Sequence, residues 1–399
     1  MDILLFYQYA VTAILLFILI NFLVNNILFK DMSKFKLPQH ILDKNPLISV
    51  LIPARNEEEN IKRCLVSLTK QDYKNIEILV LDDGSLDNTA GVVKELSEKD
   101  HRIKLYSGDL LKKGWLGKSY ACWQLSKHAK GDYLIFTDAD TLHFPNSISG
   151  AVACLLRYNL DALSVFPKEI MVTFHERMMI PFGHYIILSL MPLYLIRKVK
   201  SALFCTAIGQ FMLFKKEVYE KIGGHKSIKG KILEDMKISK RVKNFGYKFM
   251  IFDGRNNVYC RMYRNFREIV KGYSKVLFAV FDYKIYKISI AIILVAAIFL
   301  FPFLILPFAI LFGWPLMIIE LIILQIIIIL ITKIILSLRF KCKAIDIIFH
   351  PISMIYLILI AIISIFTART GMGVYWKGRI YDVSKEDELS LLSDNYKIT

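Results

Sequence analysis

The 399 residues suffice for one sizeable domain and a further segment, and their formal net charge is +17. Hydrophobic residues make up 55% of the chain, with a mean hydropathy of +0.44, and they concentrate at the two ends, which excludes a uniformly soluble protein. Six scattered cysteines without a Cys-x-x-Cys pair argue against a zinc site or a disulfide framework and fit a reducing compartment.

The N-terminal apolar segment, Ile3 to Phe29, is long enough to span a bilayer. It lacks a basic n-region and a small-residue cleavage site, so residues 1–30 are predicted to form an uncleaved transmembrane anchor. Lys30, Lys34 and Lys36 follow it, and the positive-inside rule then places the next part of the chain in the cytoplasm.

A globular domain is predicted over residues 45–280, where short apolar runs alternate with helical patterns. The predicted strands cover 47–52, 76–81, 103–106 and 133–137, and the helices cover 57–68, 87–96 and 119–128. This alternation predicts a doubly wound α/β sheet, whose ligands bind beyond the carboxyl ends of the strands. No glycine-rich dinucleotide or P-loop motif follows a strand.

Polar motifs follow three of these strands: Pro53–Glu57, Asp82–Ser85 and Asp138–Asp140. In an extended chain residues i and i+2 point to the same side, so Asp138 and Asp140 can converge on one point. Two adjacent carboxylates raise each other's pKa unless a cation lies between them. Taken alone, the motif is equally compatible with a polar turn whose acids face water.

Basic residues concentrate between Arg197 and Lys287, with 22 Lys and Arg against 7 Asp and Glu. Because this region leads directly into apolar sequence, we expect most of it to face anionic lipid rather than nucleic acid. A few of these side chains remain candidates for phosphate contacts.

Further apolar segments lie near the C-terminus. Ile288 to Thr332 is broken at Gly313-Trp-Pro315, which predicts two spans, and Ile345 to Phe366 is a third candidate. A transmembrane region is therefore predicted over 285–368, followed by a tail over 369–399.

The tail raises a conflict of topology. Three spans would place it outside, whereas Arg369, Lys377 and Arg379 favour the cytoplasm. The working hypothesis is that one apolar segment, such as Ile345 to Phe366 with its Pro351, is re-entrant or interfacial.

Between Leu47 and Lys275 the chain resembles the family 2 glycosyltransferases with the GT-A fold. The resemblance rests on an ordered set of motifs: IPARNEE, LVLDDGSLDNT, GWLGK, FTDADT, GQFMLFKKEVYEKIGGH and LEDMKISKRVKNFGY. It implies an enzyme that takes a sugar from a nucleoside diphosphate.

The resemblance also implies roles in donor binding. Asp83 is expected to contact the nucleotide base and Glu57 to lie near the ribose. Asp138 and Asp140 are expected to hold a divalent cation, Mg²⁺ or Mn²⁺, together with the donor diphosphate. Lys118, in a glycine-containing turn before a helix, suits phosphate contact, with a solvated surface lysine as the alternative.

The resemblance also implies roles for residues near the acceptor. Asp235 of the Glu234-Asp235 pair is expected to be the general base of an inverting transfer, unless both acids only serve the helix dipole. Gly209 and Gln210 are expected to line the acceptor pocket, with a turn before a strand as the alternative.

Two details indicate which branch of the family the chain resembles. Arg261 and Arg264 resemble a [Q/R]-x-x-R-W motif that contacts diphosphate and acceptor, with membership of the basic region as the alternative. Asn265 replaces the tryptophan of this motif, which argues against a processive polysaccharide synthase. Trp376-Lys-Gly-Arg-Ile-Tyr resembles the tail of ceramide glucosyltransferases and places Trp376 near the acceptor.

The apolar stretch Met178 to Ile196 supports a lipid acceptor. Pro181 and Pro192 argue against a straight span, so interfacial structure is predicted, with a pair of core helices as the alternative. The sequence thus predicts a multi-pass cell-membrane glycosyltransferase with a cytoplasmic catalytic domain, using a UDP-hexose donor and a lipid acceptor. A processive polysaccharide synthase and a non-catalytic membrane partner that keeps the fold are the alternatives.

Overall fold

The computed structural model describes residues 2–199, 201–369, 374–382 and 390–393. The chain divides into two compact units. The sheet unit comprises Phe29–Ile170, Tyr194–Met262 and Tyr375–Thr399, and the helical unit comprises Met1–Leu28, Met171–Leu193 and Tyr263–Val374.

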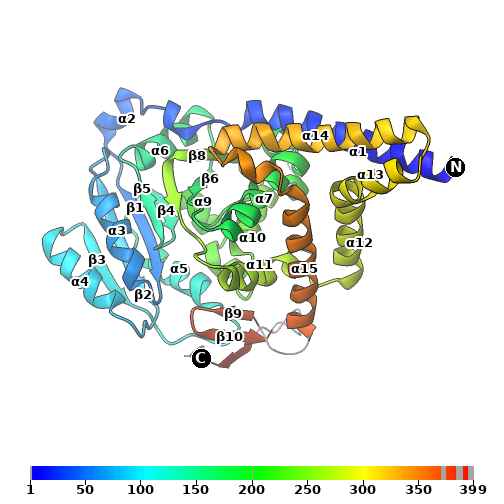
Figure 1. Cartoon of the computed structure of the whole chain (residues 1–399). Coiled ribbons are helices and arrows are strands. Elements are labelled where there is room, and N and C mark those ends of the chain that lie inside the picture. The colour runs from blue at the N-terminus through cyan, green and yellow to red at the C-terminus, as the bar shows by residue number, and fades with distance from the viewer. Residues whose placement is uncertain (1, 200, 370–373, 383–389, 394–399) are drawn as a thin grey trace. The chain divides into compact units, whose positions relative to one another are not determined.

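An eight-stranded sheet forms the centre of the sheet unit (Figure 1). Its order is β3-β2-β1-β4-β7-β6-β8-β5. Neighbours β3, β2, β1 and β4 are parallel, β6 and β8 are parallel, and β7 is antiparallel to both β4 and β6. The strand bounds are β1 Ile48–Ala54, β2 Ile76–Asp82, β3 Ile103–Ser107, β4 Tyr133–Thr137, β5 Thr141–His143, β6 Ala162–Glu169, β7 Phe211–Lys215 and β8 Phe249–Cys260.

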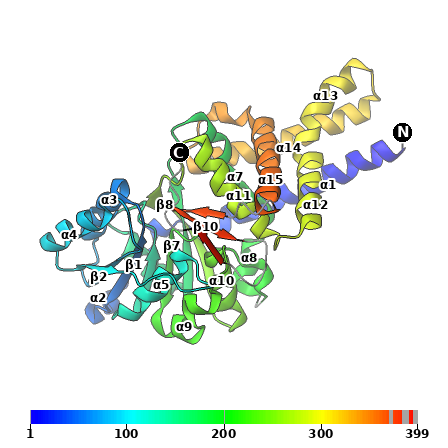
Figure 2. The same cartoon turned by 90° about the horizontal axis from the view of Figure 1, so that it is seen from below.

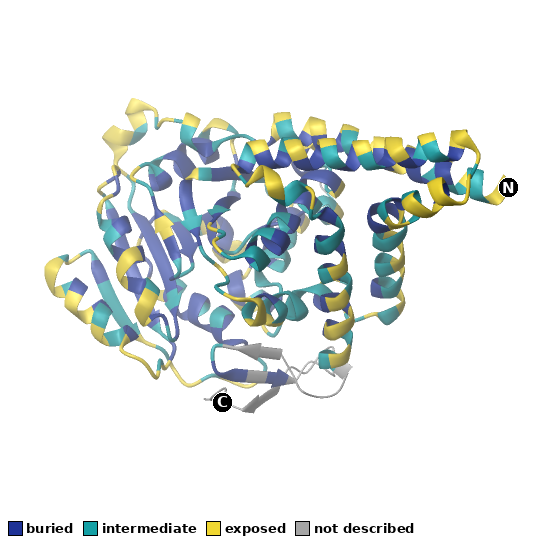
Figure 3. Cartoon of the chain, viewed as in Figure 1, coloured by how far each residue is buried: buried dark blue, intermediate teal, exposed yellow. Residues whose placement is uncertain are grey.

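The central strands are buried on both faces because helices cover them (Figure 3). On one face Val50 and Ile52 share a hydrophobic core with Ile61 and Leu65 of α3, while α5 packs against β1 and β2. The helices of this unit are α2 Gln39–Lys44, α3 Glu58–Thr69, α4 Thr89–Lys99, α5 Gly117–His128, α6 Ser147–Arg157, α9 Lys216–Lys221 and α10 Glu234–Asn244. The predicted α/β fold class is confirmed.

Among the described residues of the helical unit, four stretches are long and apolar enough to cross a membrane: Asp2–Leu28, Ile285–Leu311, Leu316–Phe340 and His350–Ala368. The elements are α1 Asp2–Leu28, α7 Phe174–Leu190, α11 Phe266–Val280, α12 Ile285–Val295, a π-helical turn Ala296–Leu300, α13 Phe301–Leu311, α14 Leu316–Phe340 and α15 His350–Arg369. The break between α13 and α14 contains Gly313, as the sequence predicts.

Buried amide side chains join the helices of this unit. Gln325 on α14 donates to the side chains of Gln8 and Thr12 on α1, at 2.8 and 3.1 Å. Asn25 on α1 donates to the carbonyl of Leu188 on α7, at 2.8 Å. Such contacts between small polar groups stabilise helix pairs in lipid, and Figures 1 and 2 show α1 running beside α14.

The stretch from Met178 to Ile196 forms two helices. Pro181 lies inside α7, and the chain turns at Met191 and Pro192 before α8, Leu193–Lys198. About half of the residues of α7 are buried, and α7 packs against α1, α11 and α15, while the interfacial placement of this stretch stays a prediction.

The tail returns to the sheet unit. Its described residues form the three-stranded sheet β11-β10-β9, with β9 at Val374–Trp376, β10 at Arg379–Asp382 and β11 at Ser390–Ser393.

Candidate active site

The ends of β1, β2 and β4 bring the predicted donor motifs to one edge of the sheet. Because these strands are parallel and in register, their carboxyl ends meet at this edge. The backbone N–H of Asp83 donates to the carbonyl of Ala54 at 2.8 Å, which ties the first two motifs together.

The turn after β2 is held by side chains from both strands. Asp82 Oδ1 accepts hydrogen bonds from the backbone N–H and the hydroxyl of Ser85. Arg55 donates to the carbonyls of Asp83 and Gly84, at 2.5 and 3.0 Å. Gly84 has a φ of +67°, a conformation that L side chains rarely adopt. Asp82 therefore supports the turn, whereas the Asp83 carboxylate makes none of these contacts within the turn.

Tail residues contact the two acids expected near the nucleoside. Arg379 forms an ion pair with Asp83, and both side chains are buried. Lys377 Nζ lies 2.8 Å from Glu57 Oε1, while the other Glu57 oxygen accepts from Asn60 at 2.8 Å.

The carboxylates of the DAD motif differ in their surroundings. Asp138 Oδ1 lies 2.7 Å from Lys118 Nζ. Asp140 Oδ1 is buried and has no hydrogen-bond partner among the residues that the structure describes. Burial first, and then the charges of Asp138 and Glu57, raises the pKa of Asp140 to about 7. A cation between the two acids would satisfy the orphaned oxygen and relieve their repulsion.

The oxygen ligands suit a hard divalent cation such as Mg²⁺ or Mn²⁺. Within the described ranges no three His, Cys, Asp or Glu side chains gather into a cage. A cation bound by one or two carboxylates completes its coordination with water and substrate phosphates, so the pair fits that role.

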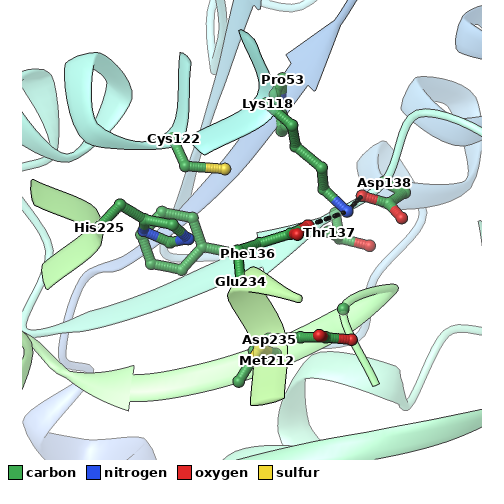
Figure 4. A pocket seen from close by; sticks show the side chains of 11 residues that line it. Pro53, Lys118, Cys122, Phe136, Thr137, Asp138, Met212, His225, Glu234 and Asp235 are labelled. Carbon is green, nitrogen blue, oxygen red and sulfur yellow. Dashed lines mark ion pairs between the residues drawn. The ribbon is translucent and has the colours of Figure 1, made fainter. Parts of the chain in front are cut away.

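A pocket that is open to solvent lies next to Asp138 (Figure 4). Lys118 projects into it from the start of α5 and joins Asp138 to Glu234, whose Oε1 is 3.2 Å from the ammonium. Asp235 lines the same pocket. One cation and three carboxylates from three separate elements therefore converge here.

Asp235 sits in the first turn of α10, where its Oδ1 accepts from the backbone N–H of Met236 at 2.7 Å. Burial, followed by the charge of Glu234, raises the pKa of Asp235 to about 7. A carboxyl with such a pKa is poised to accept a proton near neutral pH.

Gly209 packs against two charged side chains of the pocket, Lys118 and Asp235. A Cβ at this position would lie 3.3 Å from Lys118 Nζ and 3.4 Å from Asp235 Oδ2. Glycine thus lets the chain before β7 approach both side chains closely.

The remaining predicted residues lie in different places. Gln210 is buried; its carbonyl accepts from the Thr137 hydroxyl at 2.7 Å, and its amide lies 3.4 Å from Glu169. Arg261 directly follows β8, whose Cys260 pairs with Thr141 after the DAD motif. Arg264 belongs to the helical unit, where its backbone N–H donates to Glu268 at 2.7 Å. Trp376 belongs to β9, and its side chain lies outside the described residues.

Sequence reasoning missed several residues of this region. Glu169 is buried at the end of β6; burial and Asp140 raise its pKa to about 8. His225 lines the pocket and contacts the Tyr219 hydroxyl at 2.8 Å, and burial lowers its pKa to about 4, which keeps it neutral. The KIGGH motif and the WKGRIY tail were the available signals for His225 and for Lys377 and Arg379.

The chain matches a known protein family and curated proteins over part of its length. The family model described as Glycosyl transferase family 2 matches residues 49–223. The chain is 29% identical over 233 residues to the 4,4'-diaponeurosporenoate glycosyltransferase of Staphylococcus haemolyticus (strain JCSC1435), covering 58% of this chain and 60% of that protein. It is 30% identical over 245 residues to the protein of the same name from Staphylococcus aureus (strain USA300), with the same coverage. The chain therefore spans 60% of the length of these curated relatives.

A solved structure is similar over nearly the whole chain. It is the mannosyltransferase PcManGT from Pyrobaculum calidifontis in complex with GDP-Man and Mn2+, with a TM-score of 0.50 and 17% identity. The match covers 92% of this chain and 99% of that one. This likeness confirms the fold predicted from the sequence.

Proposed function

We propose that the chain is a membrane-bound, inverting glycosyltransferase, because its residues 49–223 match the family model described as Glycosyl transferase family 2. It moves a hexose from a nucleoside diphosphate, UDP in the first instance, to a hydroxyl or carboxyl of a lipid at the cytoplasmic leaflet. The observation that carries the proposal is the convergence of Asp138, Lys118, Glu234 and Asp235 on one pocket beyond the strand ends.

Asp235 is the general base of this proposal. The acceptor oxygen attacks the anomeric carbon as the bond from that carbon to the diphosphate oxygen breaks. When the acceptor is a hydroxyl, its proton passes to an Asp235 oxygen, whereas an ionised carboxyl attacks without a proton to transfer. In both cases the sugar configuration inverts because attack and departure occur on opposite faces. The raised pKa of Asp235 supports this role, since a base with a pKa near the working pH is most effective.

Asp138 and Asp140 would hold the divalent cation, which supplies charge neutralisation for the departing diphosphate. Lys118 adds a fixed positive charge beside Asp138. Glu234 keeps the Lys118 ammonium in the pocket from the opposite side. The orphaned oxygen of Asp140 supports cation binding independently of any relative.

A lipid acceptor is supported by composition and by the relatives. Four helical stretches among the described residues are long and apolar enough to cross a membrane, and the two similar staphylococcal proteins are named for diaponeurosporenoate. The lysines after the first stretch support a cytoplasmic sheet unit.

The test uses membranes that contain the full chain and radiolabelled UDP- and GDP-sugars with Mn²⁺ or Mg²⁺. Label entering the organic phase with one donor supports the proposal and names the sugar. Label in insoluble polymer would instead indicate a polysaccharide synthase. No transfer with any donor, in membranes supplemented with candidate lipids, would count against an enzyme.

Asp235→Asn is the decisive variant. Loss of the base should lower the transfer rate by about 10²- to 10⁴-fold while the affinity for UDP stays within about twofold. Asp43→Asn, at the exposed end of α2, is the matched control and should leave both unchanged. Equal activity of the Asp235 variant would remove the general-base role.

A further inference from the structure

We propose that the Lys377–Arg379 turn of the tail occupies the nucleoside end of the donor site and must leave it when a nucleoside diphosphate binds. This inference rests on the proposed function, because it takes Asp83 and Glu57 as the acids that meet base and ribose. It assigns to the tail a role in the donor site rather than near the acceptor.

Arg379 engages both oxygens of the Asp83 carboxylate. Its Nη1 pairs with Oδ2, and its Nη2 lies 3.2 Å from Oδ1. Asp83 is 3% exposed and Arg379 is 4% exposed. A guanidinium that binds a carboxylate in this fork geometry covers the edge that a base N–H would need. A base therefore cannot pair with Asp83 while Arg379 is in place.

Lys377 forms an ion pair with one oxygen of the Glu57 carboxylate. Its ammonium lies 2.8 Å from Glu57 Oε1, and its charge also acts on Asp140. One short turn thus neutralises an acid from the end of β1 and an acid from the end of β2. The two pairings differ in exposure, because the Lys377 side chain is 38% exposed and the Arg379 side chain 5%.

Backbone contacts fix the turn at the same edge. Arg55 Nε donates to the carbonyl of Lys377 at 2.8 Å, and the backbone N–H of Gly117 donates to the Tyr381 hydroxyl at 3.1 Å. Lys377 and Gly378 have φ values of +45° and +87°, as in the tight turns that join antiparallel strands. The turn is consequently a formed structural feature, held by the ends of β1 and β2 and by the start of α5.

The charged groups of the turn and of the site can keep favourable partners when the turn leaves the donor site. A nucleoside diphosphate offers its base and ribose to the two acids, and the two released cations become solvated when the turn leaves the site. The exchange replaces two internal ion pairs by contacts with the donor and with water, so neither acid nor cation needs to remain buried without a partner. Because only open molecules bind the donor, the apparent Kd equals the intrinsic Kd divided by the fraction of molecules that are open.

Arg379→Ala and Lys377→Ala test this inference by titration of UDP and of GDP into the full chain in lipid nanodiscs with Mn²⁺. If about nine-tenths of the molecules are closed, removing Arg379 should lower the Kd about tenfold. Lys377→Ala, on a more exposed pair, should shift the Kd in the same direction by a smaller factor. Arg102→Ala is the matched control, since it breaks a similar ion pair, 2.7 Å to Asp100, before β3 at the opposite ends of the strands.

Hydrogen exchange of the unmodified chain gives a second readout that does not depend on a variant folding. Amides of Gly378, Arg379 and Tyr381 should exchange faster when UDP and Mn²⁺ are added. Slower exchange together with weaker UDP binding by Arg379→Ala would overturn the proposal and make Arg379 a donor ligand. An unchanged Kd in both tail variants would also overturn it.

The labelled-sugar assay separates the two proposals. Lipid labelling by the unmodified chain with no change of Kd in the tail variants would defeat the tail inference alone. Failure of the unmodified chain and of Arg379→Ala to bind UDP or GDP would defeat both.

Discussion

Asp235 and Asp140 are two carboxyls of the candidate site, and burial raises the pKa of each. Both carboxyls have a pKa of about 7, raised first by burial and then by a neighbouring acid. The neighbours differ in consequence: Glu234 is already paired with Lys118, whereas the DAD pair leaves one oxygen of Asp140 without a partner. The same shift therefore suits a proton acceptor at Asp235 and a cation ligand at Asp140.

The pH dependence of transfer follows from Asp235. A base must be deprotonated to act, and a carboxyl whose pKa is raised to about 7 is mostly protonated below that pH. We expect the transfer rate at saturating donor and Mn²⁺ to rise with pH and to level off above about pH 7. Initial rates of lipid labelling across this range measure it. A rate that falls as pH rises through neutrality would contradict the assignment.

Cation binding is the prediction at Asp140. Mn²⁺ with UDP should raise the thermal unfolding midpoint of the full chain, because a ligand that binds only the folded state stabilises it. Asp140→Asn removes one ligand and should abolish most of the rise. Asp109→Asn, at an exposed position in the same unit, should keep it. Chelation with EDTA should return the unmodified chain to its starting midpoint, and an unchanged rise in Asp140→Asn would place the cation elsewhere.

Among the elements, β4 carries the catalytic motif and depends on a close backbone contact at its start. Gly131 lies just before β4, and a Cβ there would be 2.6 Å from the Leu47 carbonyl and 2.7 Å from the Ser49 nitrogen. These are backbone atoms of the neighbouring strand region, so they cannot rotate away. The position of Asp138 at the far end of β4 therefore depends on a glycine at its near end.

Gly131→Ala should destabilise the sheet unit by about 1–3 kcal/mol, the usual cost of overpacking. Gly183→Ala is the matched control, since no atom lies within 4 Å of a Cβ there and alanine favours the interior of α7. The thermal unfolding midpoints of both variants provide the measurement, first without nucleotide and then with UDP and Mn²⁺. Equal midpoints would mean that β4 can shift away from β1 at little cost.

The sequence predicts the elements of this sheet better than their order. Buried runs such as Ile76–Asp82 are recognisable from their β-branched and apolar residues, and strand ends mark where ligands bind. The antiparallel insertion of β7 between β4 and β6 is not encoded in any local pattern. The backbone groups of β4 and β6 need hydrogen-bond partners on the edges that face each other. Strand β7, about 70 residues after β4 in the chain, supplies them.

At the scale of the whole molecule, the contacts of the tail bear on membrane topology. Arg379 and Tyr381 contact Asp83 and Gly117 of the same unit, so the proposed membrane topology must place these two tail residues on the same side as the sheet. Three apolar stretches separate them in sequence, and three complete crossings would place them on opposite sides. We expect only two to cross.

Helix α15 is the candidate for the stretch that does not cross. It packs along α11, and its Ser364 hydroxyl accepts from the backbone N–H of Phe278 at 3.1 Å. Helix α11 is amphipathic and carries Arg267, Lys271 and Lys275, a composition typical of helices that lie in the interface. The interfacial placement of the segment from Ile345 to Phe366 stays a prediction, because α15 is also long and apolar enough to cross a membrane.

Cysteine labelling with a membrane-impermeant reagent checks the topology. In a cysteine-depleted chain, single cysteines at Lys70 and after Thr399 should react alike, and a cysteine at Gly313 should show the opposite accessibility. Joint labelling of the positions at 313 and after Thr399 from outside would contradict the two-crossing arrangement.

The sequence by itself determined the strand and helix alternation, the apolar segments and the Asp138-Ala-Asp140 motif, because each depends on residues only a few positions apart. Tertiary structure decided which distant groups meet: Lys118 with Glu234, Gly209 with Asp235, and Arg379 with Asp83, which lies 296 residues away in the chain. Local periodicity fixes which way a side chain points, whereas such pairings depend on how the sheet closes and on which buried charges must be matched.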